Sequence, residues 1–137
     1  MRVFLDTNVL ASAFGTRGLC TDVVREVMAK HELLISSLVL EELTRTLTVK
    51  FRVPADDVKA ITDSLTDYCV TTTGLVKPTI VLRDPNDVQI VAAAIDGHAD
   101  VLVTGDQDIL TAKSQLPITI ADPREFWSLL KTQRPAP

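Results

Sequence analysis

Apolar residues along this chain occur in two patterns, short continuous runs and stretches with helical spacing. The run Val101-Leu102-Val103, bounded by polar residues, is typical of a strand buried on both faces of a parallel sheet. Residues 19–30 instead place Val23, Val24 and Val27 on one helix face. These patterns predict strands at residues 2–6, 32–36, 69–72, 100–104 and 118–121. They predict helices at residues 8–14, 19–30, 37–49, 55–68 and 85–97, directly after Asp106, and from residue 123 onward.

Polar residues, glycine and proline mark where several of these helices begin and end. Ser36 or Ser37 can cap the helix that follows the second strand. Gly97 follows an Ala-rich helix, at a position where glycine suits a helix C-terminus. Asp122-Pro123-Arg124-Glu125 has a capping residue, proline at the first helical position and glutamate at the third, so a final helix is expected there. Residues 74–83 are expected to be a loop or an irregular extended segment.

Strands and helices alternate from one end of the chain to the other. This order favours an α/β fold with three α/β/α layers and a mostly parallel central sheet of about four to five strands. The 137 residues suit one domain, which we expect at residues 1–132, followed by a loose tail at residues 133–137.

The composition narrows the class of protein. Hydrophobic residues make up 46% of the chain and charged residues 23%, which are ordinary values for a soluble globular protein. No apolar run approaches the roughly 18 residues needed to cross a membrane. The N-terminus also lacks the apolar segment of a secretory signal, so we expect a cytoplasmic protein without membrane contact. Cys20 and Cys69 fit free thiols in a reducing cytosol better than a disulfide, which stays open as an alternative.

The net charge is −4, with 18 acidic residues against 14 basic ones. Taken alone, this acidity disfavours a nucleic-acid partner. Without Asp6, Glu42, Asp87, Asp106 and Asp108, however, 13 acids face 14 bases. The net charge therefore decides little if these five acids converge on a metal.

Two acidic residues stand at the ends of predicted strands. Asp6 closes the first strand, and Asp106 lies two residues past Thr104, just after the buried run that forms the fourth strand. Functional sites of open parallel sheets lie at the carboxyl ends of the strands. Both carboxylates are therefore expected at the same edge.

Helical phase adds a third acid to this edge. Positions 87, 90, 91 and 94 share one helix face, and Ile90, Val91 and Ala94 are apolar. Asp87 is therefore predicted to point inward. An acid near a helix N-terminus is also favourable without any site, because of the helix dipole.

Two further acids have alternative interpretations. Glu42 borders the apolar stripe of its helix, whereas Glu41 points closer to the solvent. Asp108 follows Asp106 by two residues, and capping of the next helix is its simplest interpretation, although it could also bind a metal.

Acids gathered at one sheet edge repel one another and are costly to bury without a partner. Divalent cations remove this cost, and carboxylate oxygens suit Mg²⁺ or Mn²⁺. Such ions support phosphate-ester chemistry. No Ser-His-Asp or Cys-His arrangement competes with this prediction.

Four segments resemble the motifs of the PIN-domain nucleases, in the order of that family and over nearly the whole chain. They are Leu5-Asp6-Thr7-Asn8-Val9-Leu10, Ile35-Ser36-Ser37 with Leu40-Glu41-Glu42-Leu43, Arg83-Asp84-Pro85-Asn86-Asp87, and Val103-Thr104-Gly105-Asp106-Gln107-Asp108. The nearest branch is similar to the VapC toxins, compact prokaryotic PIN proteins that belong to toxin–antitoxin pairs.

This resemblance implies a metal-dependent endoribonuclease that uses Mg²⁺ or Mn²⁺. The implied catalytic and metal-binding acids are Asp6, Glu42, Asp87 and Asp106, with Asp108 as an additional metal ligand. The implied supporting residues are Asn8, Ser37 and Thr104. Asn8 could equally cap the first helix, and Ser37 could simply start its own helix.

The resemblance also implies an RNA substrate, a small antitoxin partner and a homodimer. The exposed helical face of residues 54–65 could serve either protein contact. Candidates for RNA contacts are Arg17, Lys50, Arg52 and Arg83, although scattered basic residues are usually just solvated.

Two other functions stay open. An aspartate at the end of the first strand also opens haloacid-dehalogenase-type phosphatases, but these need a second acid where this chain has Asn8. In a non-catalytic interaction module, the acids would serve as helix caps, and added metal would leave the stability unchanged.

Overall fold

The computed structural model describes residues 1–73 and 82–132. Within these ranges, five strands form one sheet that is parallel throughout, in the order β3-β2-β1-β4-β5. The strands are β1 (Arg2–Leu5), β2 (Glu32–Ser36), β3 (Val70–Thr72), β4 (Val101–Val103) and β5 (Thr119–Ala121). The helices are α1 (Thr7–Gly15), α2 (Leu19–Lys30), α3 (Ser37–Val49), α4 (Ala55–Tyr68), α5 (Pro85–Asp96), α6 (Gln107–Thr111) and α7 (Pro123–Thr132).

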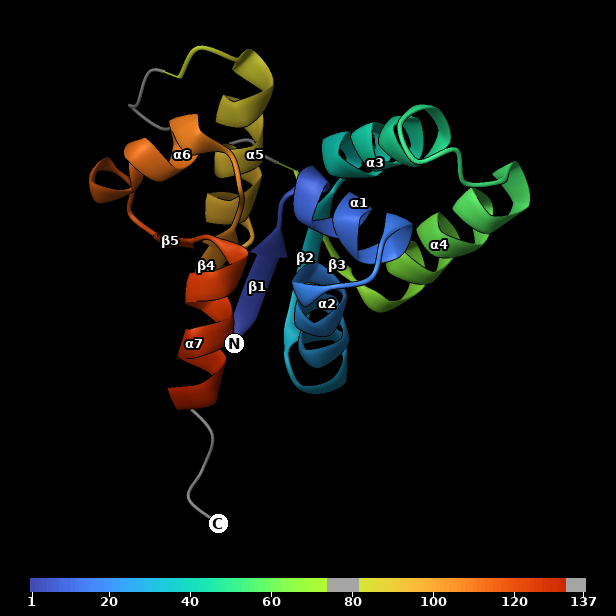
Figure 1. The fold of residues 1–137 in the computed structure, drawn as a ribbon. Coiled ribbons are helices and arrows are strands. Elements are labelled where there is room, and N and C mark those ends of the chain that lie inside the picture. Colours follow the sequence, from blue (N-terminus) through green and yellow to red (C-terminus); the bar gives the residue numbers. More distant parts are fainter. Residues whose placement is uncertain (74–81, 133–137) are drawn as a thin grey trace.

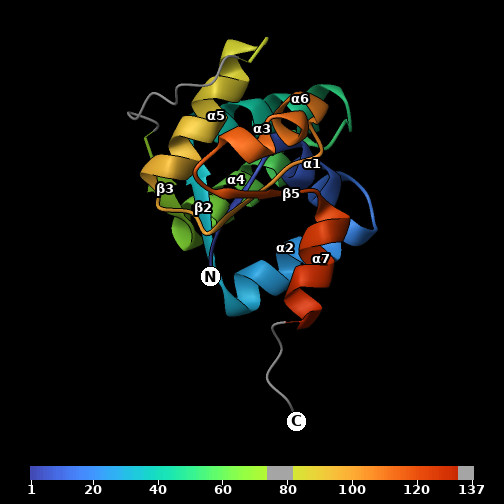
Figure 2. The same cartoon turned by 90° about the vertical axis from the view of Figure 1, so that its left-hand side faces the viewer.

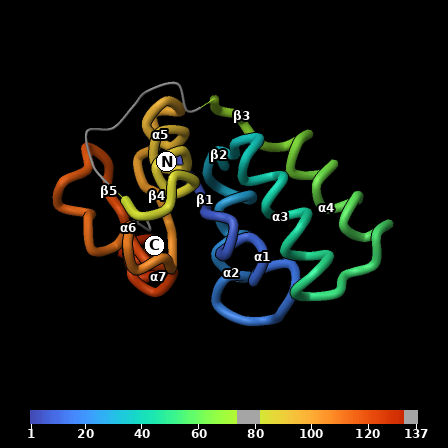
Figure 3. The backbone as a smooth tube through the Cα atoms, turned by 90° about the horizontal axis from the view of Figure 1, so that it is seen from above, coloured from blue at the N-terminus to red at the C-terminus, as the bar shows by residue number. Residues whose placement is uncertain are grey.

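Helices cover both faces of this sheet (Figure 1). Seen from above, α5 lies on one side of the sheet, and α2 and α7 lie on the other (Figure 3). Helix α5 packs on β2, β3 and β4, whereas α2 packs on β2 and α7 on β5. Helices α2 and α7 also contact each other, as Figure 2 shows. This arrangement confirms the predicted three-layer α/β/α fold.

The order of the strands reverses between β1 and β4, which are neighbours at the centre of the sheet. Leu5 pairs with Val103 at this boundary, and the backbone N–H of Asp6 donates to the carbonyl of Val103 at 3.0 Å. In doubly wound sheets, ligands bind outside the carboxyl ends of the strands at such a reversal. The residues that follow β1 and β4 therefore stand where the fold favours a site.

The central strands supply the core. Val3, Phe4 and Leu5 of β1 are fully buried, and so are Leu102 and Val103 of β4. Burial on both faces explains why these strands are continuous apolar runs rather than alternating ones. It also fixes the positions of the polar residues that follow each run.

The start of α7 follows its predicted capping pattern. The backbone N–H of Glu125 donates to Oδ1 of Asp122 at 2.8 Å, and the N–H of Asp122 donates to Oε1 of Glu125 at 3.3 Å. These reciprocal bonds form a capping box.

Gly97 is the C-cap of α5, as predicted, but its backbone conformation does not require glycine. Its φ is −78°, and the left-handed backbone conformation falls on His98, with φ 53°. A Cβ atom at position 97 would lie 2.5 Å from Cγ2 of Thr72 and 3.1 Å from Cδ1 of Leu34. Glycine is therefore required by close packing of the end of α5 against the sheet, and not by the helix-terminal conformation.

Other boundaries differ from the predicted ones by one or two residues, and a 3₁₀ helix, η1 (Lys113–Gln115), is an element that the apolar pattern does not predict. Residues 74–81 of the expected irregular segment and the expected tail at 133–137 lie outside the described residues. The domain limits therefore stay a prediction. None of the helices in the described ranges is long and apolar enough to cross a membrane.

Candidate metal centre

Asp6 follows β1 directly and caps α1. Its Oδ1 accepts a hydrogen bond from the backbone N–H of Thr7 at 2.6 Å, and its Oδ2 accepts one from the hydroxyl of Thr104 at 2.6 Å. Burial raises the pKa of Asp6, the two hydrogen bonds lower it, and the nearby Asp106 raises it again. Both oxygens of this carboxylate are thus held in a place that disfavours its negative charge.

Two threonines connect Asp6 to its acidic neighbours. The hydroxyl of Thr7 donates to Oε2 of Glu42 at 3.3 Å. The hydroxyl of Thr104 donates to Asp6 and accepts from the backbone N–H of Asp106 at 3.0 Å. Acids from three distant parts of the sequence are joined in this way at the carboxyl edge of the sheet.

Glu42 reaches the site from α3. Its Oε1 is buried and has no hydrogen-bond partner among the described residues. Burial raises the pKa of Glu42, the hydrogen bond from Thr7 lowers it, and the charges of Asp6 and Asp84 raise it. A buried carboxylate oxygen without a partner is costly. A cation or a hydrogen-bond donor bound at this atom would therefore stabilise the protein.

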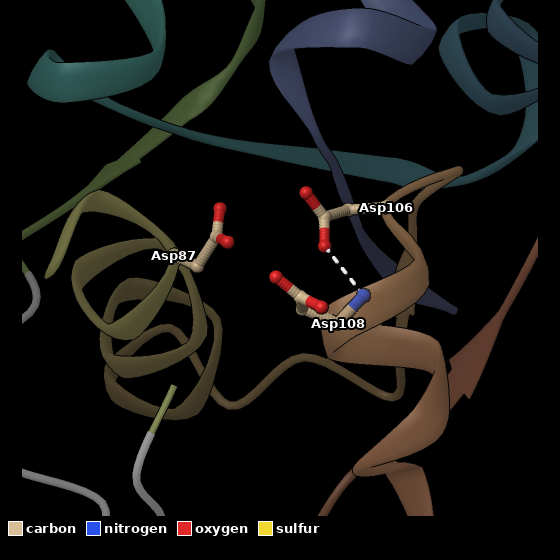
Figure 4. A group of neighbouring side chains, drawn as sticks. All are labelled: Asp87, Asp106 and Asp108. Carbon is tan, nitrogen blue, oxygen red and sulfur yellow. Dashed lines mark hydrogen bonds between the residues drawn. The ribbon is translucent and has the colours of Figure 1, made fainter. Parts of the chain in front are cut away.

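Asp87, Asp106 and Asp108 form the tightest acidic group (Figure 4). Each offers a carboxylate oxygen that lies within 4.8 Å of the other two. Asp87 comes from the first turn of α5, Asp106 precedes α6, and Asp108 lies in the first turn of α6. Figure 4 shows the three carboxyl groups turned toward the same space between these two helices.

Asp87 is buried, as its helical phase predicts, with 8% of its surface exposed. Burial is the largest cause that raises the pKa of Asp87, and together with the charges of Asp106, Asp84, Asp6 and Asp108, in that order, it brings the pKa to about 6. A carboxyl group surrounded by like charges is stabilised by a bound cation.

Asp106 is the cap of α6, because its Oδ1 accepts from the backbone N–H groups of Asp108 at 2.9 Å and Ile109 at 3.2 Å. The expectation that Asp108 caps this helix is wrong. Oδ1 of Asp108 instead accepts from Arg83 at 2.8 Å, and the Arg83 side chain is 87% exposed. Capping uses only Oδ1 of Asp106 and leaves its Oδ2 available to a ligand.

The three predicted supporting residues lie in different surroundings. Thr104 is fully buried and contacts two of the acids. Asn8 is exposed on α1, whose cap is Asp6, so the alternative that Asn8 caps this helix is wrong. Ser37 is the exposed first residue of α3, and Ser36 is the cap of that helix.

Sequence reasoning missed Thr7 and Asp84. Thr7 stands directly after Asp6, but its bond to Glu42 depends on α1 packing against α3. Asp84 caps α5 and raises the pKa of both Asp87 and Glu42. The sequence does contain a signal for the capping role of Asp84, because an aspartate followed by proline is typical of a helix start.

The donor set fits a divalent cation that prefers oxygen ligands. Asp87, Asp106 and Asp108 each offer a carboxylate oxygen, and the three oxygens all lie within 4.8 Å of one another, close enough to share one ion. Glu42 adds a buried oxygen without another partner. Within the described ranges, no second group of three metal-binding side chains occurs. The residues therefore suit Mg²⁺ or Mn²⁺.

Comparison with known proteins adds a family and a fold. The family profile described as PIN domain matches residues 2–108. No curated protein matches the chain with significant sequence similarity.

Three solved structures share the fold at low sequence identity. One is VapBC2 from Rickettsia felis bound to a DNA fragment from its promoter, with a TM-score of 0.65, 18% identity, and coverage of 89% of this chain and 98% of that one. Another is a PilT N-terminus domain protein from the archaeon Sulfolobus solfataricus, with a TM-score of 0.61, 12% identity, and coverage of 100% and 99%. FitAcB from Neisseria gonorrhoeae has a TM-score of 0.56, 13% identity, and coverage of 89% and 98%.

Proposed function

Because the chain belongs to the PIN domain family, we propose that it is a metal-dependent endoribonuclease that hydrolyses RNA phosphodiester bonds. The observation that carries this proposal is the convergence of acids at the carboxyl edge of the sheet, where the strand order reverses. An open edge rich in carboxylate oxygens is what metal-assisted hydrolysis of a phosphate ester requires.

In this proposal Asp87, Asp106 and Asp108 hold Mg²⁺ or Mn²⁺, and Asp6 and Glu42 complete the acidic site. The bound cation would supply positive charge to the phosphate and make a water molecule more acidic. Oδ2 of Asp106 and Oε1 of Glu42 are available for this purpose, because neither accepts a hydrogen bond within the described part of the chain.

The neighbouring side chains position these acids and the substrate. Thr7 and Thr104 orient the Asp6 carboxylate through one hydrogen bond to each oxygen. Arg83 stands at the rim, in an exposed ion pair with Asp108. Exposed pairs of this kind are weak, so the guanidinium can leave Asp108 and bind an RNA phosphate.

We extend the proposal to the toxin half of a cytoplasmic toxin–antitoxin pair. The motifs resemble those of the VapC toxins, and the structural neighbours VapBC2 and FitAcB are toxin–antitoxin complexes. The proposed partners are a small antitoxin and a second copy of this chain. The surface proposed for such contacts, residues 54–65, is largely exposed apart from Val58 and Leu65.

The test is cleavage of a labelled single-stranded RNA in EDTA and then in Mg²⁺ or Mn²⁺. We expect products only with metal. The cleavage rate of Asp6→Asn should be at least about 100-fold lower than that of the wild type. Asparagine also caps helices, so this variant should keep its fold. Asp67→Asn, which removes an exposed charge from α4, is the matched control.

Cleavage that survives EDTA, or an Asp6→Asn variant as active as the wild type, would contradict the proposal. Hydrolysis of a phosphomonoester with the RNA left intact would favour a phosphatase. A melting temperature that does not respond to either metal would favour a non-catalytic module.

A further inference from the structure

A polar hollow of about 390 Å³ opens between the start of α3, strand β3 and helix α5. Ser37 and Glu41 of α3, Thr71 and Thr72 of β3 and Gln89 of α5 line it. The volume lies within the roughly 300–1,000 Å³ of small-molecule sites. None of the five acids of the candidate metal centre lines this hollow, so the two sites are separate.

The hollow nevertheless lies close to the acidic group. The hollow opens at the same edge of the sheet as the acids, because Ser36 ends β2 and Thr72 ends β3. Strand β2 pairs with β1, which Asp6 follows directly. Helix α5 packs against both α3 and β3, and Figure 3 shows these elements as neighbours. An RNA with a phosphate at the acids can therefore place an adjacent nucleotide in the hollow.

The residues that line the hollow can both donate and accept hydrogen bonds. The Glu41 carboxylate only accepts, the Gln89 amide offers two donors and an acceptor, and the hydroxyl groups do both. The first turn of α3 adds backbone N–H donors. Thr72 is 7% exposed, and its hydroxyl has no partner among the described residues. A polar ligand would supply hydrogen bonds that this lining does not satisfy itself.

Glu41 favours a base over a phosphate as the ligand. It is the one charged side chain among the described lining residues, and its negative charge repels a phosphate. Guanine presents two adjacent N–H donors on its Watson–Crick edge, which match the two oxygens of a carboxylate, with an acceptor oxygen beside them. No aromatic side chain belongs to the described lining, so recognition relies on hydrogen bonds rather than stacking.

We propose that this hollow binds an unpaired guanine next to the cleaved bond, with Glu41 accepting from the base and Gln89 completing the contacts. This inference rests on the proposed ribonuclease function and adds a sequence preference to it. Glu41 and Gln89 are both exposed, so their substitution tests recognition without threatening the fold.

The first test is cleavage of a random-sequence RNA pool with Mn²⁺, followed by sequencing of the product ends. Guanine should be enriched at least about fivefold at one fixed position near the cut, the lower range for one bidentate base contact. Glu41→Gln and Gln89→Ala should flatten this enrichment. Asp67→Asn should keep the wild-type preference. A wild type that cleaves without this preference, or a Glu41→Gln variant that keeps it, overturns the guanine site and leaves the ribonuclease function standing.

The second test does not depend on cleavage. Titration of the four nucleoside monophosphates is followed by amide chemical shifts in EDTA. Guanosine monophosphate should shift the amides of Ser37, Thr72 and Gln89, and Glu41→Gln should weaken its binding at least about fivefold. If the pool is not cleaved but guanine still binds here, the ribonuclease function fails and the site stands. Equal binding of all four nucleotides, or shifts confined to other residues, overturns the guanine site.

Discussion

The two ends of the central sheet carry charged residues in opposite arrangements. At the amino end, Arg2 donates from Nη1 to Glu32 at 2.8 Å and from Nε to the carbonyl of Gly97 at 2.9 Å. Its backbone N–H donates to Asp100 at 2.7 Å. The acids of this end therefore have partners of opposite charge or polarity.

At the carboxyl end, acids gather with little compensation. Burial raises the pKa of Asp6, Glu42 and Asp87. Arg83 forms the one ion pair of this group in the described structure, and its side chain is almost fully exposed. The comparison shows that one end contributes to stability through pairing, whereas the other holds ionised groups at a cost in free energy. Such an edge is a candidate for function because most of these charges have no basic partner among the described residues.

The largest expected effect is a loss of RNA cleavage that occurs on substitution at the carboxyl end of the sheet and not at the amino end. Asp106→Asn should reduce metal-dependent RNA cleavage at least about 100-fold, because it removes a charged oxygen ligand. At the amino end, Glu32→Gln should leave the rate within about twofold. Initial rates on one labelled RNA in Mn²⁺ check both. Similar losses in the two variants would show that the ends do not differ in function.

The next effect is stabilisation by metal. At a concentration of 100 times Kd, Mg²⁺ or Mn²⁺ should raise the free energy of unfolding by about 2.7 kcal/mol. Glu32→Gln should keep this gain, and Asp108→Asn should lose most of it. Thermal unfolding with added metal and with EDTA measures the difference. A gain that Asp108→Asn retains in full would place the metal elsewhere.

A smaller effect is a gain in stability, whereas most substitutions destabilise a protein. The folded protein holds the pKa of Asp87 at about 6, above the ordinary 3.8. The folded state therefore binds more protons between these values, and its stability falls as the pH rises from about 4 to 6. Asp87→Asn should consequently stabilise the metal-free protein by about 1–2 kcal/mol at pH 7.5 and by little at pH 4. Urea unfolding in EDTA at both pH values tests this, and a variant less stable than the wild type at pH 7.5 would reverse the argument.

The smallest effects concern the two arginines. The Arg2 side chain is 35% exposed and donates to two partners, whereas the Arg83 side chain is 87% exposed and pairs with Asp108 alone. Arg2→Gln should cost about 1 kcal/mol, and Arg83→Gln should cost less than Arg2→Gln. Urea unfolding at low salt should rank them in this order. The reverse order would mean that the carboxyl end depends on its ion pair.

The sequence contained most of the fold because each strand is a short apolar run and each helix has its own apolar face. The helix over residues 19–30 and the strand over residues 32–36 coincide with α2 and β2. The sites of Asp6 and Asp106 follow from the strands that precede them. The inward direction of Asp87 follows from one helix face, which needs no knowledge of the rest of the molecule.

The contacts between elements could not be read in this way. The bond from Thr7 to Glu42 requires α1 and α3 to pack together, and the place of Thr104 between two acids requires the register of β1 against β4. Gly97 shows the same limit, because its role depends on the distance to Thr72 in another element. The local sequence pattern predicts the order of the elements and the direction of a side chain on its own element. The hydrogen-bond and packing partners of that side chain depend on how the elements pack together.

Asp6 and Asp106 are each both a helix cap and a member of the acidic group. Asparagine caps a helix as well as aspartate does, so a single Asp-to-Asn change at either position would remove the charge and keep the architecture. Under the proposed function, such a change would give a catalytically silent copy that still folds. Among related sequences, the identity of these two caps would then separate working copies from decoys more sharply than overall similarity does.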